Sequence, residues 1–102
     1  MKRYKLTTDA TRDFDEIIQY YLVTAGADVA LRFNDEFEEA FEALAADPGF
    51  GSTLLKLTSE PVRFWKLRNY LIIYDPQTRP VDVLAIYHGA RHVRRLLRRR
   101  LT

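Results

Sequence analysis

The sequence contains no cysteine, and glycine and proline occur only four times each among its 102 residues. The lack of cysteine excludes a disulfide framework, a thiolate metal site and a thiol nucleophile. No apolar run approaches the roughly 18 residues that a transmembrane helix needs. The basic start at residues 1–5 leads into no long apolar segment, so it does not resemble a signal peptide. We therefore expect a cytoplasmic protein that has no contact with membranes.

The short motifs of several enzyme classes are also missing. None of the glycines has the GxGxxG or GxxxxGK spacing of a phosphate-binding loop. His88 and His92 are four residues apart, but no glutamate lies between them in the HExxH pattern of zinc sites. Ser52 and Ser59 stand in no nucleophile-elbow motif. We expect neither a metal ion nor a cofactor.

The composition that is present is typical of one folded domain. Hydrophobic residues make up 47%, aromatic residues 13% and charged residues 29% of the chain, which argues against disorder. Area scaling predicts that folding buries about two-thirds of the surface of the extended chain. We expect residues 1–102 to form a single domain, because a chain of this length leaves no room for a second one.

Acidic and basic residues are unevenly divided along the chain. Residues 1–47 carry eleven acidic and five basic side chains, whereas residues 48–102 carry three acidic and eleven basic ones. Such a division indicates a dipolar molecule whose basic side is suited to an anionic partner. Two solvated faces of opposite sign explain the division equally well.

Two helices are expected in the first half. Alternation over residues 3–7 predicts a short strand, after which Thr8 or Asp9 can cap a helix. An apolar stripe recurs at helical spacing until Gly26, which tolerates the positive φ of a helix end. A second apolar stripe spans residues 30–44, and the short connection predicts an antiparallel helical hairpin.

The second half changes to an extended pattern. β-Branched and aromatic residues gather in segments 62–67, 70–74 and 81–87, with candidate turns at 68–69 and 75–80. The short connections predict an antiparallel meander. The third segment is nearly continuous in apolar character, which predicts a central strand.

We therefore predict an α+β fold with the element order β-α-α-β-β-β, followed by a short basic C-terminal helix over residues 90–101. Layering rules place the helical hairpin on one face of a mainly antiparallel sheet. This arrangement should bury Phe14 and Ile17 from the first helix, together with Phe37 and Phe41 from the second. The opposite face is left to the last helix or to a partner.

Candidate functional residues lie in the basic, aromatic second half. Cleavage of RNA by its own 2′-hydroxyl needs an acid, a base and cations at the phosphate. Histidine titrates near neutral pH and can serve as acid or base, which makes His88 a candidate. Tyr87, Arg63 and Arg91 can supply the remaining groups. A structural role for His88 and solvated arginines are the simpler alternative, so the residues alone leave the function open.

An ordered set of short motifs runs along nearly the whole chain. They are Leu6-Thr7, Ala10, Asp13-Phe14, Ile17, Tyr21, Gly26, Ala30, Phe33, Phe37, Leu44, Pro48, Gly51, Arg63, Leu67, Tyr70-Leu71-Ile72-Ile73-Tyr74 and Ile86-Tyr87-His88-Gly89-Ala90-Arg91. In this order the set resembles the ParE branch of the RelE/ParE toxin superfamily, the toxin halves of type II toxin–antitoxin pairs.

The resemblance implies two partners. Toxins similar to this chain are held inactive by a ParD-like antitoxin, in a hetero-oligomer that contacts DNA mainly through the antitoxin. Free ParE-type toxins inhibit DNA gyrase, whereas RelE-type toxins cut messenger RNA on the ribosome. The chain has the ParE-like form His88-Gly89-x-Arg91 and lacks a terminal His-Tyr pair. We therefore expect a gyrase inhibitor that is not an enzyme, with a ribosome-dependent endoribonuclease as the alternative.

The same resemblance suggests which residues make these contacts. The expected target-binding residues are Arg63, Lys66, Arg68, His88, Arg91 and Arg94. The expected antitoxin-binding residues are Trp65, Val93, Leu97 and Arg98. No catalytic residue is expected, but under the ribonuclease alternative the catalytic set is His88, Arg91, Arg63 and Tyr87.

Overall fold

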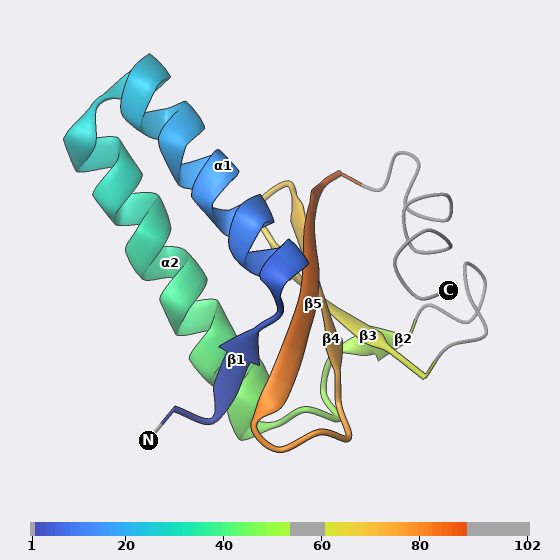
Figure 1. The fold of residues 1–102 in the computed structure, drawn as a ribbon. Helices are drawn as coiled ribbons and strands as arrows, with labels where there is room; N and C mark the ends of the chain where they lie inside the picture. Colours follow the sequence, from blue (N-terminus) through green and yellow to red (C-terminus); the bar gives the residue numbers. More distant parts are fainter. Residues whose placement is uncertain (1, 54–60, 90–102) are drawn as a thin grey trace.

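The computed structural model describes residues 2–53 and 61–89 of the chain. Two long antiparallel helices lie side by side across one face of a β-sheet (Figure 1). The α+β order is the one expected, with one additional short strand before the meander. In chain order the elements are β1 (Tyr4–Leu6), α1 (Thr8–Ala25), α2 (Ala27–Ala46), β2 (Ser52–Thr53), β3 (Arg63–Leu67), β4 (Tyr70–Asp75) and β5 (Val81–His88).

The five strands are arranged in the order β1-β5-β4-β3-β2. β4 lies in the middle, and β5, which was expected to be central, lies next to it and is paired on both sides. β2 to β5 pair antiparallel, which confirms the meander, whereas β1 is parallel to β5. This parallel pair forms because the helical hairpin carries the chain to the far edge of the sheet, and the meander returns it beside β1.

The ends of the two helices are set by local chemistry. Thr7 caps α1, rather than the expected Thr8 or Asp9, and its Oγ1 accepts a hydrogen bond from the Ala10 amide at 3.2 Å. Thr7 takes this role because it is the last extended residue, with φ −65° and ψ 169°, so its hydroxyl faces the free amides of the first turn. Gly26 alone separates the helices, with a φ of 94° that strains residues with a side chain.

The main core lies between the helical hairpin and the sheet. Phe37 and Phe41 are fully buried, and Phe14 packs edge-on against both with ring centroids 5.5 Å apart. Ile17 packs beside this core and is partly buried. The expected burial is confirmed for α2, while the two α1 residues keep part of their surface accessible. The other buried members of the core are Tyr4, Ala10, Ala40, Leu44, Ala45, Tyr70, Ile72, Tyr74, Val81, Val83 and Ile86.

A bulge in β5 places neighbouring apolar residues of this strand on opposite faces of the sheet. Ile73 of β4 pairs with Ala85 of β5. The next pair joins Tyr74 to Val83, and Leu84 is left unmatched between the two pairs. Leu84 therefore packs on the face opposite the helices, while Val83 returns to the main core. The buried residues of the smaller cluster on that opposite face are Val62, Leu71, Ile73, Ala85 and Tyr87.

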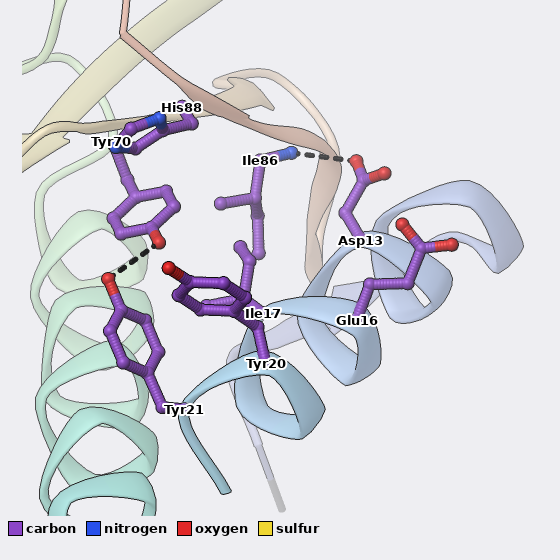
Figure 2. A pocket seen from close by; sticks show the side chains of 8 residues that line it. All are labelled: Asp13, Glu16, Ile17, Tyr20, Tyr21, Tyr70, Ile86 and His88. Atoms are coloured by element: carbon purple, nitrogen blue, oxygen red, sulfur yellow. Dashed lines mark hydrogen bonds between the residues drawn. The ribbon is translucent and has the colours of Figure 1, made fainter. Parts of the chain in front are cut away.

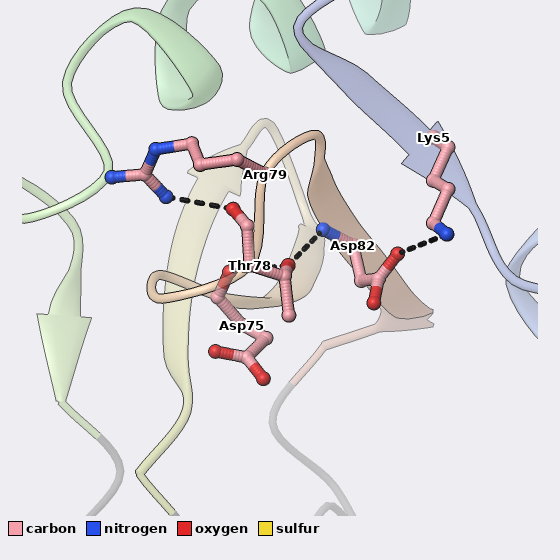
Figure 3. A network of polar contacts seen from close by, with 5 residues as sticks. All are labelled: Lys5, Asp75, Thr78, Arg79 and Asp82. Carbon is pink, nitrogen blue, oxygen red and sulfur yellow. Dashed lines mark hydrogen bonds and ion pairs between the residues drawn. The ribbon is translucent and has the colours of Figure 1, made fainter.

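Polar side chains hold the connection between β4 and β5 (Figure 3). The Thr78 hydroxyl accepts a hydrogen bond from the Asp82 amide at 2.8 Å, and Arg79 donates to the Thr78 carbonyl at 2.7 Å. Lys5 of β1 places its Nζ atom 3.6 Å from the Asp82 carboxylate. These contacts fix the start of β5 and tie the parallel edge strand to it.

Neither helix in the described part of the chain is long and apolar enough to cross a membrane. The segment 90–101, expected to form a basic helix over the opposite face of the sheet, lies outside the described residues. That helix therefore stays a prediction.

Candidate functional site

Tyr74 closes the end of the sheet that lies near the loop between α2 and β2. Its hydroxyl donates a hydrogen bond to the Pro48 carbonyl at 2.8 Å and accepts one from the Gly51 amide at 3.1 Å. The Tyr74 ring is fully buried. Residue 51 has to be glycine, because a Cβ there would fall on the Tyr74 hydroxyl and within 2.8 Å of the Phe64 carbonyl oxygen. Tyr74 thus fastens this loop to the middle strand.

Arg63 belongs to the same closed end. Its guanidinium donates a hydrogen bond to the Gly51 carbonyl at 2.6 Å, and the side chain is half-buried. Arg63 is the register partner of Tyr74, so both side chains lie on the helix-covered face of the sheet. Burial raises the pKa of the Tyr74 phenol, while the Gly51 amide and the Arg63 charge offset part of that rise. The positive charge of Arg63 is therefore engaged with the protein's own loop.

Arg68 occupies the tight turn between β3 and β4, at the opposite end of the sheet. Arg68 and Asn69 form this turn as expected, and Arg68 adopts a φ of 53°. Its guanidinium donates two hydrogen bonds to the Glu36 carboxylate on α2, of 2.8 and 2.7 Å, and lies 5.0 Å from the centre of the Phe33 ring. The hydrogen bond from Arg68 lowers the pKa of Glu36. This exposed pair joins the turn to the helical hairpin.

A ladder of rings leads from Arg68 into the space between α1 and the sheet. Phe33 stacks on Tyr21, with ring centroids 3.9 Å apart and planes inclined by 9°. The hydroxyls of Tyr21 and Tyr70 are hydrogen-bonded at 3.0 Å, and the Tyr70 ring lies 5.0 Å from the imidazole ring of His88. Burial raises the pKa of Tyr70, and the hydrogen bond with Tyr21 adds to that rise. Both helices, the β3–β4 turn and the end of β5 thus meet here.

A pocket of about 480 Å³ lies beside this ladder, between α1 and the sheet (Figure 2). Figure 2 shows the carboxylates of Asp13 and Glu16 on one side, and the tyrosine hydroxyls and His88 on the other. Over the described part of the chain, no group of three or more histidine, aspartate and glutamate side chains is placed to hold a metal ion. The residues that line the pocket are Asp13, Glu16, Ile17, Tyr20, Tyr21, Tyr70, Ile86 and His88.

Asp13 has a structural role as well. The pairing of β1 with β5 ends at Val83, so α1 covers the next part of this strand edge. The Asp13 carboxylate accepts a hydrogen bond from the Ile86 amide at 2.9 Å, in place of the carbonyl of a neighbouring strand. The Thr7 hydroxyl donates to the Leu84 carbonyl at 3.4 Å on the same edge. These bonds hold the start of α1 beside β5, and Asp13 and Ile86 also line the pocket.

Comparison with known proteins identifies the family. The family model described as the ParE toxin of the type II toxin–antitoxin system parDE matches residues 4–93. This chain belongs to the ParE toxin family. A chain of a solved structure described as the chromosomal ParDE TA system from P. aeruginosa shares its fold, with a TM-score of 0.69 and 24% identity over 87% of this chain and 97% of that one. No curated protein matches the sequence.

In this ParE-family fold, the described residues that were expected to be catalytic under the ribonuclease alternative do not lie together. His88 and Tyr87 are neighbours on β5, so their side chains point to opposite faces of the sheet. Tyr87 is buried in the cluster on the face away from the helices, whereas His88 is exposed beside Tyr70. Arg63 lies at the other end of the sheet, and Arg91 lies outside the described residues.

The expected binding residues are divided as well. Lys66 is exposed and projects from the face opposite the helices, whereas His88 lies on the helix side. Arg63 and Arg68 are held by contacts within the toxin fold. Trp65, expected to bind the antitoxin, packs against the main core. The remaining expected site residues lie outside the described part of the chain: Arg91, Val93, Arg94, Leu97 and Arg98.

Sequence reasoning missed the pocket residues that α1 contributes to this ParE-family fold. Asp13, Ile17 and Tyr21 are part of the family resemblance, but their spacing indicates only an amphipathic helix. A usable signal is the spacing of Asp13, Glu16 and Tyr20, which are three and four residues apart and therefore share one edge of the apolar stripe. Polar groups at the edge of a buried stripe border the space between the helix and its neighbour.

Proposed function

We propose that this chain is the toxin of a type II toxin–antitoxin pair, that it inhibits DNA gyrase when free, and that a ParD-like antitoxin neutralises it. The observation that carries the proposal is the match of the ParE toxin family model to residues 4–93. The similar fold of a chain from a ParDE system of P. aeruginosa supports a partner of the ParD kind. In the proposed complex the antitoxin makes most of the contact with DNA.

We infer that inhibition works by binding and not by catalysis. Acid–base cleavage of RNA needs an acid, a base and cations within hydrogen-bonding reach of one phosphate. His88 and Tyr87 lie on opposite faces of the sheet, and Arg63 is bound to the Gly51 carbonyl at its other end. This division supports a binding protein over the alternative, a ribosome-dependent endoribonuclease.

The proposed gyrase-binding surface is the end of the sheet next to the β3–β4 turn. Lys66 and His88 are both exposed at this end. Arg91 and Arg94 follow β5 in the sequence but lie outside the described residues, and we expect them to add positive charge to the proposed surface. Complementary charge of this kind steers association with an anionic surface. Arg68 supports the surface indirectly by fixing the turn.

A supercoiling assay tests this proposal. Purified toxin at micromolar concentration should stop gyrase from supercoiling relaxed plasmid DNA. Lys66→Ala and Arg91→Ala should each raise the half-inhibitory concentration about fivefold, the effect of roughly 1 kcal/mol of lost binding. Arg12→Ala removes an exposed cation from α1 and should leave inhibition unchanged. Undisturbed supercoiling would exclude gyrase, and new cleavage sites in translated messages would establish the ribonuclease alternative.

The antitoxin is tested separately by co-purification. The product of the neighbouring reading frame should bind the toxin and abolish its inhibition of gyrase. Leu97→Asp should weaken this complex while the melting temperature of the isolated toxin stays unchanged. A lower melting temperature would show instead that Leu97 supports the toxin's own fold. Normal growth of cells that express the chain without antitoxin would contradict toxicity.

A further inference from the structure

The strand β3 has one edge that is only partly paired. β2 pairs with the first two of its five residues. Within residues 2–53 and 61–89, no strand pairs with Trp65, Lys66 or Leu67 on that outer side of the sheet (Figure 1). An open edge of this kind can accept a further strand from another chain. We propose that gyrase binds here by adding an extended segment in which an acidic side chain stands between two apolar ones.

The inference rests on the proposed function, because it names the part of the toxin that receives gyrase and the chemistry of the gyrase segment. An exposed aromatic pair lies directly beside the open edge. Phe50 is 74% exposed, and its ring centroid lies 5.8 Å from that of Trp65. Aromatic side chains are enriched at protein interfaces, so an apolar side chain of the added strand is expected to cover these rings. A pocket of about 320 Å³ adjoins them and is lined by Phe50, Gly51, Ser52, Phe64, Trp65 and Lys66.

The loop that carries Phe50 is held in place by contacts within the toxin. The Phe50 amide donates a hydrogen bond to the Asp47 carbonyl at 3.0 Å. The next residue, Gly51, is fixed through its amide by Tyr74 and through its carbonyl by Arg63. A group that is ordered before binding loses less conformational freedom when a partner arrives. The contacts of Tyr74 and Arg63 therefore also hold the aromatic anchor beside the open edge.

Lys66 determines the charge that the added strand should carry. Its side chain is exposed on the face opposite the helices and has no ion-pair partner among the described residues. A side chain directly opposite Lys66 on the added strand would lie on the same face, where an acidic group is stabilising. Trp65 and Leu67 lie on the other face and pack against the main core, so they favour apolar partners. The expected order in the gyrase segment is therefore apolar, acidic, apolar.

The same lysine disfavours a second copy of this chain as the occupant. Antiparallel pairing of two such edges about their centre would place the two copies of Lys66 opposite each other, and like charges in this position are destabilising. The edge also runs through Lys66 to the β3–β4 turn, so it is continuous with the proposed gyrase-binding surface. Charge and position together favour gyrase.

The first test measures strand addition with a peptide. Acetyl-Thr-Leu-Glu-Val-Thr-amide is titrated into the full-length chain, and the fluorescence of Trp65, the only tryptophan in the sequence, reports on the site. We expect a saturable change, and at least about fivefold weaker binding when lysine replaces glutamate in the peptide. Lys66→Ala should weaken binding of the glutamate peptide about fivefold. Arg12→Ala removes an exposed cation from α1 and should leave binding unchanged. The absence of any saturable change would overturn the proposal.

Methylation of the peptide amides distinguishes strand pairing from contacts made by side chains alone. Alternate amides of an added strand face its neighbour, and the amides between them point away. One peptide is methylated at the glutamate amide, and another at the leucine and valine amides together. We expect one of these peptides to lose binding and the other to keep most of it. Equal binding of the two, whether retained or lost, would contradict the addition of a strand.

The second test establishes whether gyrase is the occupant. Phe50→Ser removes the aromatic anchor and should raise the half-inhibitory concentration of the toxin in the supercoiling assay at least about fivefold. Leu31→Ser removes a side chain of α2 that is 62% exposed and should leave inhibition unchanged. The melting temperature of each variant shows whether it is folded. An excess of the glutamate peptide should also relieve inhibition by the natural chain, whereas the lysine peptide should not.

The outcomes separate this inference from the proposed function. If the natural chain inhibits gyrase but neither Phe50→Ser nor the glutamate peptide reduces inhibition, the inference is wrong although the proposed function stands. If Phe50→Ser weakens only the binding of the antitoxin, the open edge belongs to the antitoxin and the assignment to gyrase is wrong. If the natural chain does not inhibit gyrase, the proposed function fails and the assignment fails with it.

Discussion

Tyr70 and Tyr74 lie on the same middle strand, face the same helices and are both buried, yet their hydroxyls meet different partners. The Tyr74 hydroxyl bonds to two backbone groups, the Pro48 carbonyl and the Gly51 amide. The Tyr70 hydroxyl bonds to another side chain, that of Tyr21, and its ring lines the pocket beside α1. One end of the strand is thus closed by the main chain, and the other end borders a cavity.

The difference shows how one residue type can bond to the main chain at one end of a strand and to another side chain at the other end. A buried backbone group that loses its hydrogen-bond partner lowers the free energy of unfolding, because no water or other polar group nearby replaces that partner. The hydroxyl of Tyr21 can bond to water instead, because Tyr21 lines the pocket. The end held by side chains can therefore exchange partners at lower cost than the end held by the main chain.

The largest effect should come from filling the closed end. Gly51→Ala places a Cβ on the Tyr74 hydroxyl and close to the Phe64 carbonyl oxygen. Overpacking of this kind should lower the free energy of unfolding by about 3 kcal/mol, which corresponds to a melting temperature lower by about 15 °C. Gly49→Ala is the matched control, because a Cβ at Gly49 meets no atom within 4 Å. Equal melting temperatures of the two variants would show that the loop is not held by Tyr74.

Removal of the two hydroxyls should have unequal effects. Tyr74→Phe leaves the Pro48 carbonyl and the Gly51 amide without their partner and should cost about 2 kcal/mol. Tyr70→Phe removes one bond between side chains and should cost about 0.7 kcal/mol. Denaturant unfolding of the two variants gives this comparison directly. A larger loss for Tyr70→Phe would reverse the roles assigned to the two ends.

Alkaline titration should distinguish the same two rings. Burial raises the pKa of Tyr70 and of Tyr74 above the usual value of 10.0, and at Tyr74 the Gly51 amide and the Arg63 charge offset part of the rise. The two protonated phenols therefore contribute their full stabilisation below the usual tyrosine pKa. This stabilisation is lost as the pH rises through the folded-state pKa of each tyrosine. Phenolate absorbance of the folded protein should show tyrosines that ionise late, and Tyr70→Phe and Tyr74→Phe should each remove one of them. Ionisation of every tyrosine at about pH 10 would contradict this burial.

The smallest effect is expected at the exposed pair of Glu36 and Arg68. The hydrogen bond from Arg68 lowers the pKa of Glu36 below 4.5, so its stabilisation is present above that pH and is lost as the pH falls through the folded pKa. Glu36→Gln should lower the melting temperature slightly at pH 7, and this difference from the natural chain should vanish in acid. High salt should reduce it as well, because the pair is exposed. Glu39→Gln serves as the control, and a difference that persists in acid would contradict the ion pair.

Local rules were sufficient for most of the fold. Apolar spacing and Gly26 predict the helical hairpin because both depend on residues within a few positions of one another. The turn at Arg68 and Asn69 was predicted for the same reason. The parallel pairing of β1 and the short strand β2 were not predicted, since each depends on a strand that is distant in the sequence. The cap at Thr7 was missed because it depends on where β1 ends.

The candidate site was less predictable than the fold. The sequence analysis predicted that basic side chains bind the target. In the structure, however, Arg63 donates a hydrogen bond to the Gly51 carbonyl and Arg68 to the Glu36 carboxylate. Neither contact can be inferred from periodicity or composition. The pocket brings α1 together with the ends of β4 and β5, so its lining is assembled from segments that no local pattern connects.

The amino-acid sequence by itself determined the order of the elements, the amphipathic faces of the helices and the membership of the ParE toxin family, because these depend on local spacing and on an ordered set of motifs. Only the tertiary structure decided which polar groups are hydrogen-bonded to other parts of the protein and which border a cavity. The physical reason is distance along the chain: Gly51 meets Tyr74 across 23 residues, and Asp13 meets Ile86 across 73. Hydrogen bonds of that separation exist only after the helices have closed over the sheet.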